Sequence, residues 1–272
     1  MGLPDTPSVA SLAEEPVAHV VDPLPPAVRV VTEHYCMILG AVPSHTIVQR
    51  VRCREDELPD VISEVRALVS DRGHSRAIWF VGPSSRPPNL LAMLRGAGFL
   101  PTTAPPWEPR YAAMVMTRPP APPTDTTISA RRVESLEEVV IGLRIDAAAT
   151  GVPDAELDAM LQAAPALYEA ECRDGQVTFL AFDGTGKAIA VATAQVSPLG
   201  LELAAAATLP DHRGQGAYRS LVHARWVEAV RRGTPALAVQ AGENSMPILE
   251  RLGFQTVGTL HAVTDPATDP PP

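Results

Sequence analysis

One stretch constrains the fold more than any other: an apolar run, a glycine-rich turn and then a helical pattern. The apolar run spans 201–209, the turn contains Arg213-Gly214-Gln215-Gly216, and the helical pattern covers 216–232. Glycines let the backbone approach a ligand closely, and the first N–H groups of a helix have no partner inside it. The positive end of the helix dipole favours an anion at the same place. The stretch therefore predicts a phosphate-binding loop, with an ordinary tight turn as the alternative.

Composition limits what such a loop could serve. The 272 residues carry a net charge of -9, with 46% hydrophobic and 19% charged residues. This describes a globular chain and argues against a nucleic-acid surface, which needs clustered lysine and arginine. The three cysteines show no metal-ligand spacing, so no metal is expected. Without a secretory signal or an apolar run of about eighteen residues, we expect a cytoplasmic protein that does not enter a membrane.

Proline-rich segments divide the chain. Six prolines among residues 1–28 predict a disordered arm, and the proline-dense segment 118–126 predicts a linker. Residues 266–272 are expected to be a frayed tail. The intervening segments, 29–117 and 127–265, are predicted to form two lobes.

Hydrophobic periodicity predicts an α+β fold, a central mixed sheet flanked by helices. The first lobe is expected to hold strands at 45–51, 76–81 and 111–116, and helices at 55–71 and 89–95. The second is expected to hold strands at 127–133, 176–182, 188–196, 201–209 and 236–240 and from 254 onward, with one helix that starts at Ser135 and others at 153–172, 216–232 and 245–252. Ser135 followed by Glu138 is a capping-box pattern at the start of one helix.

The two lobes end in similar sequences. Residues 92–99 can be laid over 247–254, with a glycine followed by phenylalanine closing each segment. Each glycine stands where a left-handed helix end is expected. The first lobe has no counterpart of the glycine turn, so a duplication would have left the ligand loop in the second lobe only.

The second lobe resembles the GCN5-related N-acetyltransferase (GNAT) superfamily. The family signature is Arg or Gln, two residues, Gly, one residue, then Gly or Ala, after a strand that ends near a proline. The sequence from Arg213 to Tyr218 fits it except at Tyr218, which replaces the small residue. The order of elements resembles the family over 127–262, most strongly over 202–254. The resemblance implies a tandem GNAT protein whose N-terminal lobe has lost the loop.

The resemblance also implies acetyl-CoA as the cofactor, bound between two splayed strands. Backbone amides of 214–218 would hold the pyrophosphate, and a short strand segment would pair with the pantetheine arm. The cofactor-binding residues expected on this basis are Ala207, Thr208, Leu209, Arg213, Gly214, Gln215, Gly216, Ala217, Tyr218, Asn244 and Ser245. Asn244 and Ser245 could equally be ordinary helix caps.

Acetyl transfer needs an amine with a free lone pair, and therefore a base. Glu202 stands eight residues before Pro210, where many relatives carry an acid in that role, and its apolar neighbours would raise a carboxyl pKa. Alternation alone cannot choose the face of the strand, so a solvent-facing Glu202 remains the alternative. The tyrosine that protonates the leaving thiolate in many relatives is replaced by Leu249, which leaves Tyr218, Ser245 or solvent for that task.

These features predict an acetyl-CoA-dependent N-acetyltransferase that acts on a primary amine of a small molecule or peptide in a ternary complex. The alternative is a CoA-binding or structural module with little or no catalysis, which the missing tyrosine favours. The sequence does not select the acceptor, and it leaves the oligomeric state open, a homodimer included.

Overall fold

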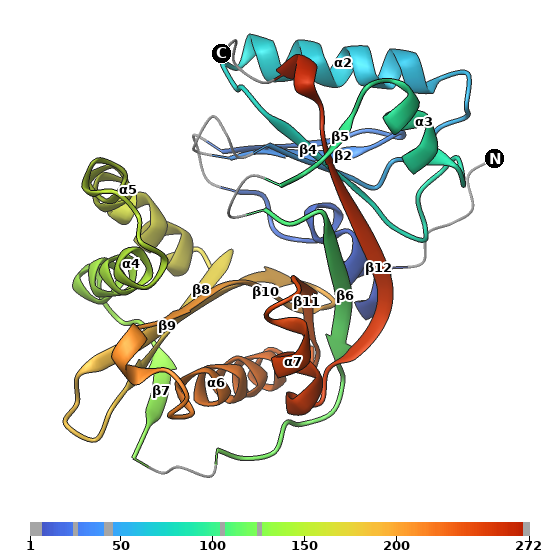
Figure 1. Cartoon of the computed structure of the whole chain (residues 1–272). Helices are drawn as coiled ribbons and strands as arrows, with labels where there is room; N and C mark the ends of the chain where they lie inside the picture. Colours follow the sequence, from blue (N-terminus) through green and yellow to red (C-terminus); the bar gives the residue numbers. More distant parts are fainter. Residues whose placement is uncertain (1–6, 24–26, 41–45, 104–106, 124–126, 269–272) are drawn as a thin grey trace. The chain divides into compact units, whose positions relative to one another are not determined.

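The computed structural model describes residues 7–23, 27–40, 46–103, 107–123 and 127–268. The chain divides into two compact units. The first comprises Met1–Met114 with Gln240–Glu250 and Gln255–Pro272, and the second comprises Val115–Val239 with Arg251–Phe254. Figure 1 traces both from the N-terminal blue to the C-terminal red. No described helix is long and apolar enough to cross a membrane.

The first unit contains a mixed sheet in the order β1-β2-β3-β4-β12. Strands β1 to β3 are antiparallel neighbours, β3 and β4 are parallel, and β12 returns antiparallel to β4. The strands are β1 (Val28–Val31), β2 (Cys36–Leu39), β3 (Thr46–Gln49), β4 (Ala77–Val81), β5 (Leu100–Pro101), β6 (Arg110–Met116) and β12 (Gln255–Thr264). The helices are α1 (Val9–Glu14), η1 (Pro16–Ala18), α2 (Leu58–Asp71), α3 (Leu90–Gly96), α7 (Met246–Leu252) and η3 (Pro266–Thr268).

The core of this unit forms where α2 lies on the sheet. The apolar residues of α2 recur at helical spacing, and Val61, Val65 and Val69 are buried on that face. They belong to one cluster with Trp79 of β4, whose ring meets that of Phe99 edge-on at 5.5 Å. The helical period thus gives α2 its place on the sheet.

The second unit is built on a sheet in the order β7-β8-β9-β10-β11. Strands β7 to β10 form an antiparallel meander, and β11 is parallel to β10. The strands are β7 (Ser129–Arg132), β8 (Gln176–Phe182), β9 (Ala188–Ser197), β10 (Gly200–Thr208) and β11 (Leu237–Ala241). The helices are α4 (Leu136–Thr150), α5 (Asp154–Cys172), η2 (Pro210–His212) and α6 (Ala217–Arg231).

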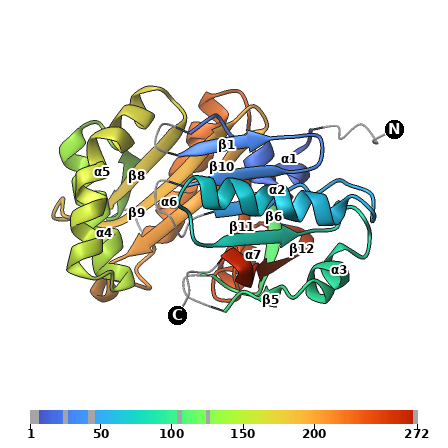
Figure 2. The same cartoon turned by 90° about the horizontal axis from the view of Figure 1, so that it is seen from above.

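Helices cover both faces of this second sheet. Figure 1 shows α4 and α5 on one face and α6 on the other, and Figure 2 shows the same layers from above. Leu180 of β8 and Val191 of β9 face α4, in one cluster with Val139. Gly142 lets α4 lie close, because a Cβ there would stand 3.0 Å from the Val191 side chain. Burial on both faces explains why β8 and β9 read as nearly continuous apolar runs.

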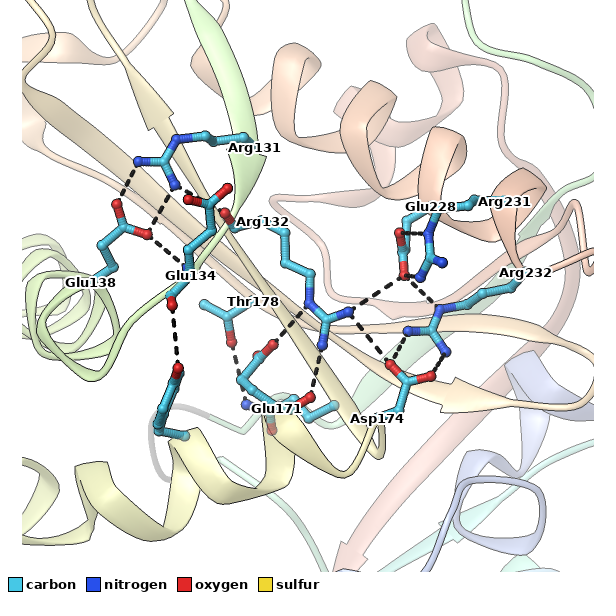
Figure 3. Close-up of polar contacts among 12 residues, drawn as sticks. Arg131, Arg132, Glu134, Glu138, Glu171, Asp174, Thr178, Glu228, Arg231 and Arg232 are labelled. Carbon is cyan, nitrogen blue, oxygen red and sulfur yellow. Dashed lines mark hydrogen bonds and ion pairs between the residues drawn. The ribbon is translucent and has the colours of Figure 1, made fainter.

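An ion-pair network joins β7 to the C-terminal ends of α5 and α6 (Figure 3). Glu228 accepts hydrogen bonds from Arg231 and Arg232 at 2.7 to 2.8 Å, and Arg232 also pairs with Asp174. Arg132 of β7 reaches Glu171 at 3.3 Å and Glu228 at 3.8 Å. The network stabilises this end of the second unit.

The observed elements match most sequence-based predictions to within a few residues. The expected α+β class, a mixed sheet flanked by helices, is confirmed. Ser135 caps α4 through its side chain, which accepts from the Glu138 N–H at 3.2 Å. The reciprocal half of the predicted capping box is absent, since Glu138 accepts from the Glu134 N–H instead.

The N-terminal segment differs from the expected disordered arm of residues 1–28. Residues 9–18 form α1 and η1, and Leu12 and Ala13 are fully buried. Ser8 and Ser11 form a capping box that starts α1 in spite of the surrounding prolines. Residues 1–6 and 24–26 of this arm, 124–126 of the expected linker and 269–272 of the expected tail lie outside the described residues.

The expected lobe boundaries differ from the compact units at the C-terminal end. We expected 127–265 to form the second lobe, whereas β12 and most of α7 cluster with the first unit. The reason is strand pairing: β12 pairs with β4 from His261↔Val81 to Thr264↔Ile78. The order of elements along the chain does not show that the last strand, β12, pairs with a strand of the first unit.

Candidate functional site

The predicted phosphate-binding loop follows β10 in the second unit. The chain leaves β10 through the short helix η2, passes Gly214 with φ +76° and reaches Gly216 with φ +94°. Both are left-handed conformations that glycine adopts without strain. A Cβ at either glycine would meet nothing within 4 Å, so the surface of the loop is open.

The main-chain donors of this loop are free. Gly216 stands at the N-cap position of α6 and supplies no side chain to cap it. The first bond of the helix runs from the Ser220 N–H to the Gly216 carbonyl at 3.1 Å. In the described part of the chain, the N–H groups of 214–218 have no acceptor. Several N–H groups at a helix N-terminus form a concave donor surface suited to a phosphate.

Side chains fix the loop from both sides. The Arg213 guanidinium donates to the Thr208 carbonyl at 3.3 Å and to the Ala149 carbonyl, at the end of α4, at 2.9 Å. Gln215 donates to the Asp211 carbonyl at 3.0 Å. These bonds hold the loop between β10 and α4, so its open donors need little rearrangement to meet an anion.

The strand that leads into the loop has an unpaired edge. β10 and β11 pair at Leu201↔Leu237 and Glu202↔Ala238, and no further pair between them follows among the described residues. From Leu203 to Thr208 the edge of β10 on that side carries no β11 ladder. An extended chain can pair with such an edge by main-chain hydrogen bonds. This segment contains the predicted pantetheine-binding residues Ala207 and Thr208.

On its other edge, β10 carries a β-bulge. Leu203 pairs with Ala194 and Ala206 with Ala192, so Ala204 and Ala205 both stand opposite Thr193. The Ala205 N–H donates to the Thr193 hydroxyl at 3.2 Å. Bulges of this kind re-aim side chains and often lie next to functional sites. The sequence signal was a run of four alanines, which we did not interpret as a bulge.

Glu202, the predicted base, is buried with only 9% of its surface exposed. The alternative of a solvent-facing Glu202 is therefore wrong. It pairs with Gln195 of β9, which in turn pairs with Gln176 of β8. Directly opposite residues of antiparallel strands share a face, and Gln176 lines a cavity below α4 and α5. Glu202 thus belongs to the face of the sheet that carries α4 and α5.

Burial raises the pKa of Glu202 to about 7, and the positive charge of Arg225 partly offsets this effect. Burial of a carboxyl disfavours its charged form. A carboxyl with a pKa near neutrality can accept a proton and release it again at working pH, which is what a general base requires.

Arg225 of α6 is a residue whose position the sequence did not predict. The residue is only 1% exposed. Its Nε donates to the Leu221 carbonyl at 3.1 Å and its Nη1 to the Thr193 carbonyl at 3.4 Å. Within the described residues its Nη2 has no acceptor. Arg225 therefore stands under the bulge as a buried positive charge.

Tyr218 is half-buried against this charge. The Arg225 guanidinium carbon lies 5.9 Å from the centre of the Tyr218 ring, in a cation–π arrangement. Arg225 thus links the two predicted catalytic residues, because its charge also acts on Glu202. The phenol belongs to the first turn of α6, beside the predicted pyrophosphate site.

The remaining predicted residues belong to the first unit. Asn244 is exposed, and the Ser245 hydroxyl donates to the Gly242 carbonyl at 3.2 Å rather than accepting from the helix that it precedes. Leu249, at the position of the usual tyrosine, is fully buried. The described residues contain no group of histidine, cysteine and acidic side chains that could hold a metal ion.

Comparisons with known proteins bear on the fold. No protein-family model matches the sequence, and no curated protein matches it. Among solved structures, a GCN5-related N-acetyltransferase from Kribbella flavida is similar, with a TM-score of 0.67, 17% identity and coverage of 95% of both chains. A tandem GNAT protein from the clavulanic acid biosynthesis pathway has a TM-score of 0.63 and 15% identity, covering 97% of this chain and 89% of its own.

A third structure, a GCN5-related N-acetyltransferase from Sphaerobacter thermophilus, has a TM-score of 0.60 and 15% identity over 87% of this chain and 81% of its own. All three likenesses extend over most of the chain and include one with a tandem arrangement. At these identities the likeness concerns the fold. The chain has the fold of the GCN5-related N-acetyltransferases along most of its length.

Proposed function

We propose that this protein transfers an acetyl group from acetyl-CoA to a primary amine. The observation that carries the proposal is the loop after β10, whose free N–H groups from 214 to 218 follow directly on an unpaired strand edge. A pyrophosphate would bind the loop, and the pantetheine arm would extend along Ala207–Leu209 as an added strand. A doubly charged linker and a peptide-like arm fit these two neighbouring features together.

The chemistry proposed for Glu202 is that of a general base in a ternary complex. Its carboxylate takes one proton from the acceptor ammonium, directly or through water. The nitrogen lone pair then forms the C–N bond at the thioester carbonyl carbon. The C–S bond breaks with its electron pair on sulfur, and the second nitrogen proton passes to the thiolate, which leaves as CoA thiol.

Tyr218 is the side chain we propose for that second proton transfer. Its phenol lies in the first turn of α6, the helix that follows the loop, whereas Leu249 offers no proton. A free thiol has a pKa of about 8.5, so a CoA thiolate can also leave and be protonated by water. Tyr218 would therefore assist the reaction without being indispensable.

The division into functional segments is part of the proposal. Residues 127–265 would bind acetyl-CoA. Residues 29–117 would be a GNAT-like lobe without a loop, since the segment 50–57 between β3 and α2 has no counterpart of the Arg213–Gly216 turn. In both segments the last helix is followed by a left-handed glycine: Gly98 after α3, with φ +93°, and Gly253 after α7, with φ +102°.

A second candidate function is CoA binding with little or no catalysis. The buried, apolar Leu249 at the usual tyrosine position favours it. The two candidates differ in turnover and agree in cofactor binding, so they can be separated by measuring both.

Calorimetric titration with acetyl-CoA tests the shared step. Gly216→Trp is expected to abolish binding because the indole would cover the open donors. Gly233→Trp is the matched control: that glycine also has a left-handed φ, +76°, and open space, but follows the other end of α6. Equal binding by both variants, or none by the wild type, would contradict the loop assignment.

A thiol-release assay over a panel of amines then separates enzyme from binding module. We expect turnover by the wild type and a loss of at least about 100-fold in kcat for Glu202→Gln, the range for removal of a general base. Unchanged turnover in this variant would remove Glu202 as the base. Cofactor binding without turnover of any amine would favour the second candidate.

A further inference from the structure

The second unit contains a cavity of about 200 Å³ below α4 and α5. It meets β10 at the bulge, where Ala205 and Ala206 form part of its wall. The other lining residues come from α4, α5, β8 and β9: Val139, Gly142, Leu143, Asp146, Leu167, Gln176, Thr178, Val191, Ala192 and Thr193. The cavity therefore opens beside the strand segment along which we placed the pantetheine arm.

Asp146 is the one charged side chain among the described residues that line this cavity. It is half-buried, and its carboxylate makes no hydrogen bond or ion pair within the described part of the chain. Burial raises the pKa of this carboxyl, and no neighbouring cation counteracts the effect.

Its place in the helix adds to the energetic penalty. Asp146 lies four residues before Thr150, the last residue of α4, and so about one turn from the C-terminal end of the helix. The helix dipole is negative there and disfavours a carboxylate. An unpaired carboxylate in an apolar wall destabilises the fold, and residues of this kind are expected at binding sites.

The size of the cavity limits the ligand. An apolar cavity of about 150 Å³ holds a benzene molecule, so about 200 Å³ suits an aromatic ring or a short branched chain with one or two further carbon atoms. The walls near Leu143, Leu167 and Val191 are hydrocarbon. A second carboxylate would meet Asp146 with the same charge, and the hydrocarbon wall offers few partners to the hydroxyl groups of a sugar.

We propose that this cavity binds the acetyl acceptor and that Asp146 pairs with its ammonium group, which makes the acceptor a small primary amine with a mainly hydrocarbon body. The inference rests on the proposed function, because only an acetyl group near the bulge would make the cavity an acceptor site. The bound ammonium gives its proton to Glu202 before attack, as described above. Asp146 acts by binding and positioning the amine.

The test compares 2-phenylethylamine with phenylalanine, which differs by one carboxylate. Binding of each is measured by calorimetry without acetyl-CoA, and KM and kcat are measured with acetyl-CoA at saturation. Asp146→Asn is expected to weaken 2-phenylethylamine binding about 10-fold or more, the range for loss of a hydrogen bond to a charged group. KM should rise by a similar factor, with a smaller change in kcat, and phenylalanine should bind more weakly than 2-phenylethylamine to the wild type.

Two further measurements separate a positioning role from a structural one. Asp146→Asn is expected to raise Tm, because it removes an unpaired, half-buried carboxylate, so weaker binding cannot come from unfolding. Asp158→Asn, on the exposed side of α5, is the matched control and should leave amine binding unchanged.

Unchanged binding and KM in Asp146→Asn would overturn the inference. So would equal or tighter binding of phenylalanine, or the absence of 2-phenylethylamine binding to the wild type. Failure of acetyl-CoA to bind would instead refute the proposed function. Amine binding is measured without acetyl-CoA, so the role of Asp146 is decided separately.

Discussion

Replacing Glu202 with glutamine is expected to change how the stability of the fold depends on pH. The carboxyl has a pKa of about 7 in the folded chain, against 4.5 for the same group in water. One pKa unit corresponds to about 1.4 kcal/mol, so ionising Glu202 in the folded protein costs about 3 kcal/mol. Glutamine has the same shape and carries no charge, so the variant escapes this penalty.

The sign of the effect follows from which state holds the proton. Between pH 4.5 and about 7 the folded chain keeps the Glu202 proton that the unfolded chain has already released. The free energy of unfolding therefore falls as the pH rises through this window, and the fall is complete above about 7. Relative to wild type, Glu202→Gln should gain about 3 kcal/mol between pH 4.5 and pH 8.

Urea denaturation of wild type and variant at pH 4.5, 6, 7 and 8 measures this difference. The contributions of other titrating groups cancel in the difference between the two unfolding free energies, because both proteins contain these groups. Glu250→Gln, at an exposed position, is the matched control for exchanging a glutamate for a glutamine. A difference between wild type and Glu202→Gln that stays constant with pH, or that shrinks as the pH rises, would refute a desolvated carboxyl at this position.

Two further predictions use the same denaturation assay. Arg225→Met removes the charge that offsets the burial of Glu202, so the folded-state pKa of Glu202 should rise and the pH at which the fall in the free energy of unfolding is complete should move above about 7; an unchanged upper end of this pH window would contradict their coupling. Glu228→Gln removes the negative charge and one of the two oxygens that accept from Arg231 and Arg232, and should lower the free energy of unfolding at pH 7 by about 1.5 to 3 kcal/mol. These arginines hold the pKa of Glu228 below its usual value of 4.5, so this contribution should be fully present above pH 4.5 and be lost as the pH falls below it and Glu228 is protonated; an effect that is the same at pH 3 and pH 7 would contradict this assignment.

Periodicity predicted the longer elements well because packing acts on them in the simplest way. The strand expected at 176–182 is β8, and the helix expected at 55–71 is α2 from Leu58 onward. Each buries a face or a whole strand, which leaves a regular apolar pattern in the sequence. The short strands β1 and β2 were missed, although β3 and β7, which are equally short, were predicted within the longer runs 45–51 and 127–133.

Local pattern failed where distant residues decide the environment. Two buried residues, Leu12 and Ala13, make α1 part of the fold although the surrounding prolines indicated disorder. Arg225 is buried, and the carbonyls of Leu221 and Thr193 accept hydrogen bonds from it inside the fold. Neither environment can be read from the residues next to it in the chain.

The candidate site was predicted unevenly for the same reason. The turn around Gly214 and Gly216 is local, because a left-handed backbone and a helix start are both marked by glycine. The face of Glu202 depends on strand pairing, which alternation cannot supply, and its burial appears only in the folded chain. Asp146 carried no signal in the sequence, since an acid on a helix usually faces water.

The extra alanine in the bulge of β10 decides to which face of the sheet each later side chain of the strand points. Glu202 and Ala207 are five positions apart, an odd number, and on a regular strand they would face opposite sides of the sheet. Here both share the face of α4 and α5, because their partners Gln195 and Val191 are four apart. Deleting a single alanine from 204–206 would therefore turn the segment before the loop over, and would disturb the site more than replacing any one of these small side chains.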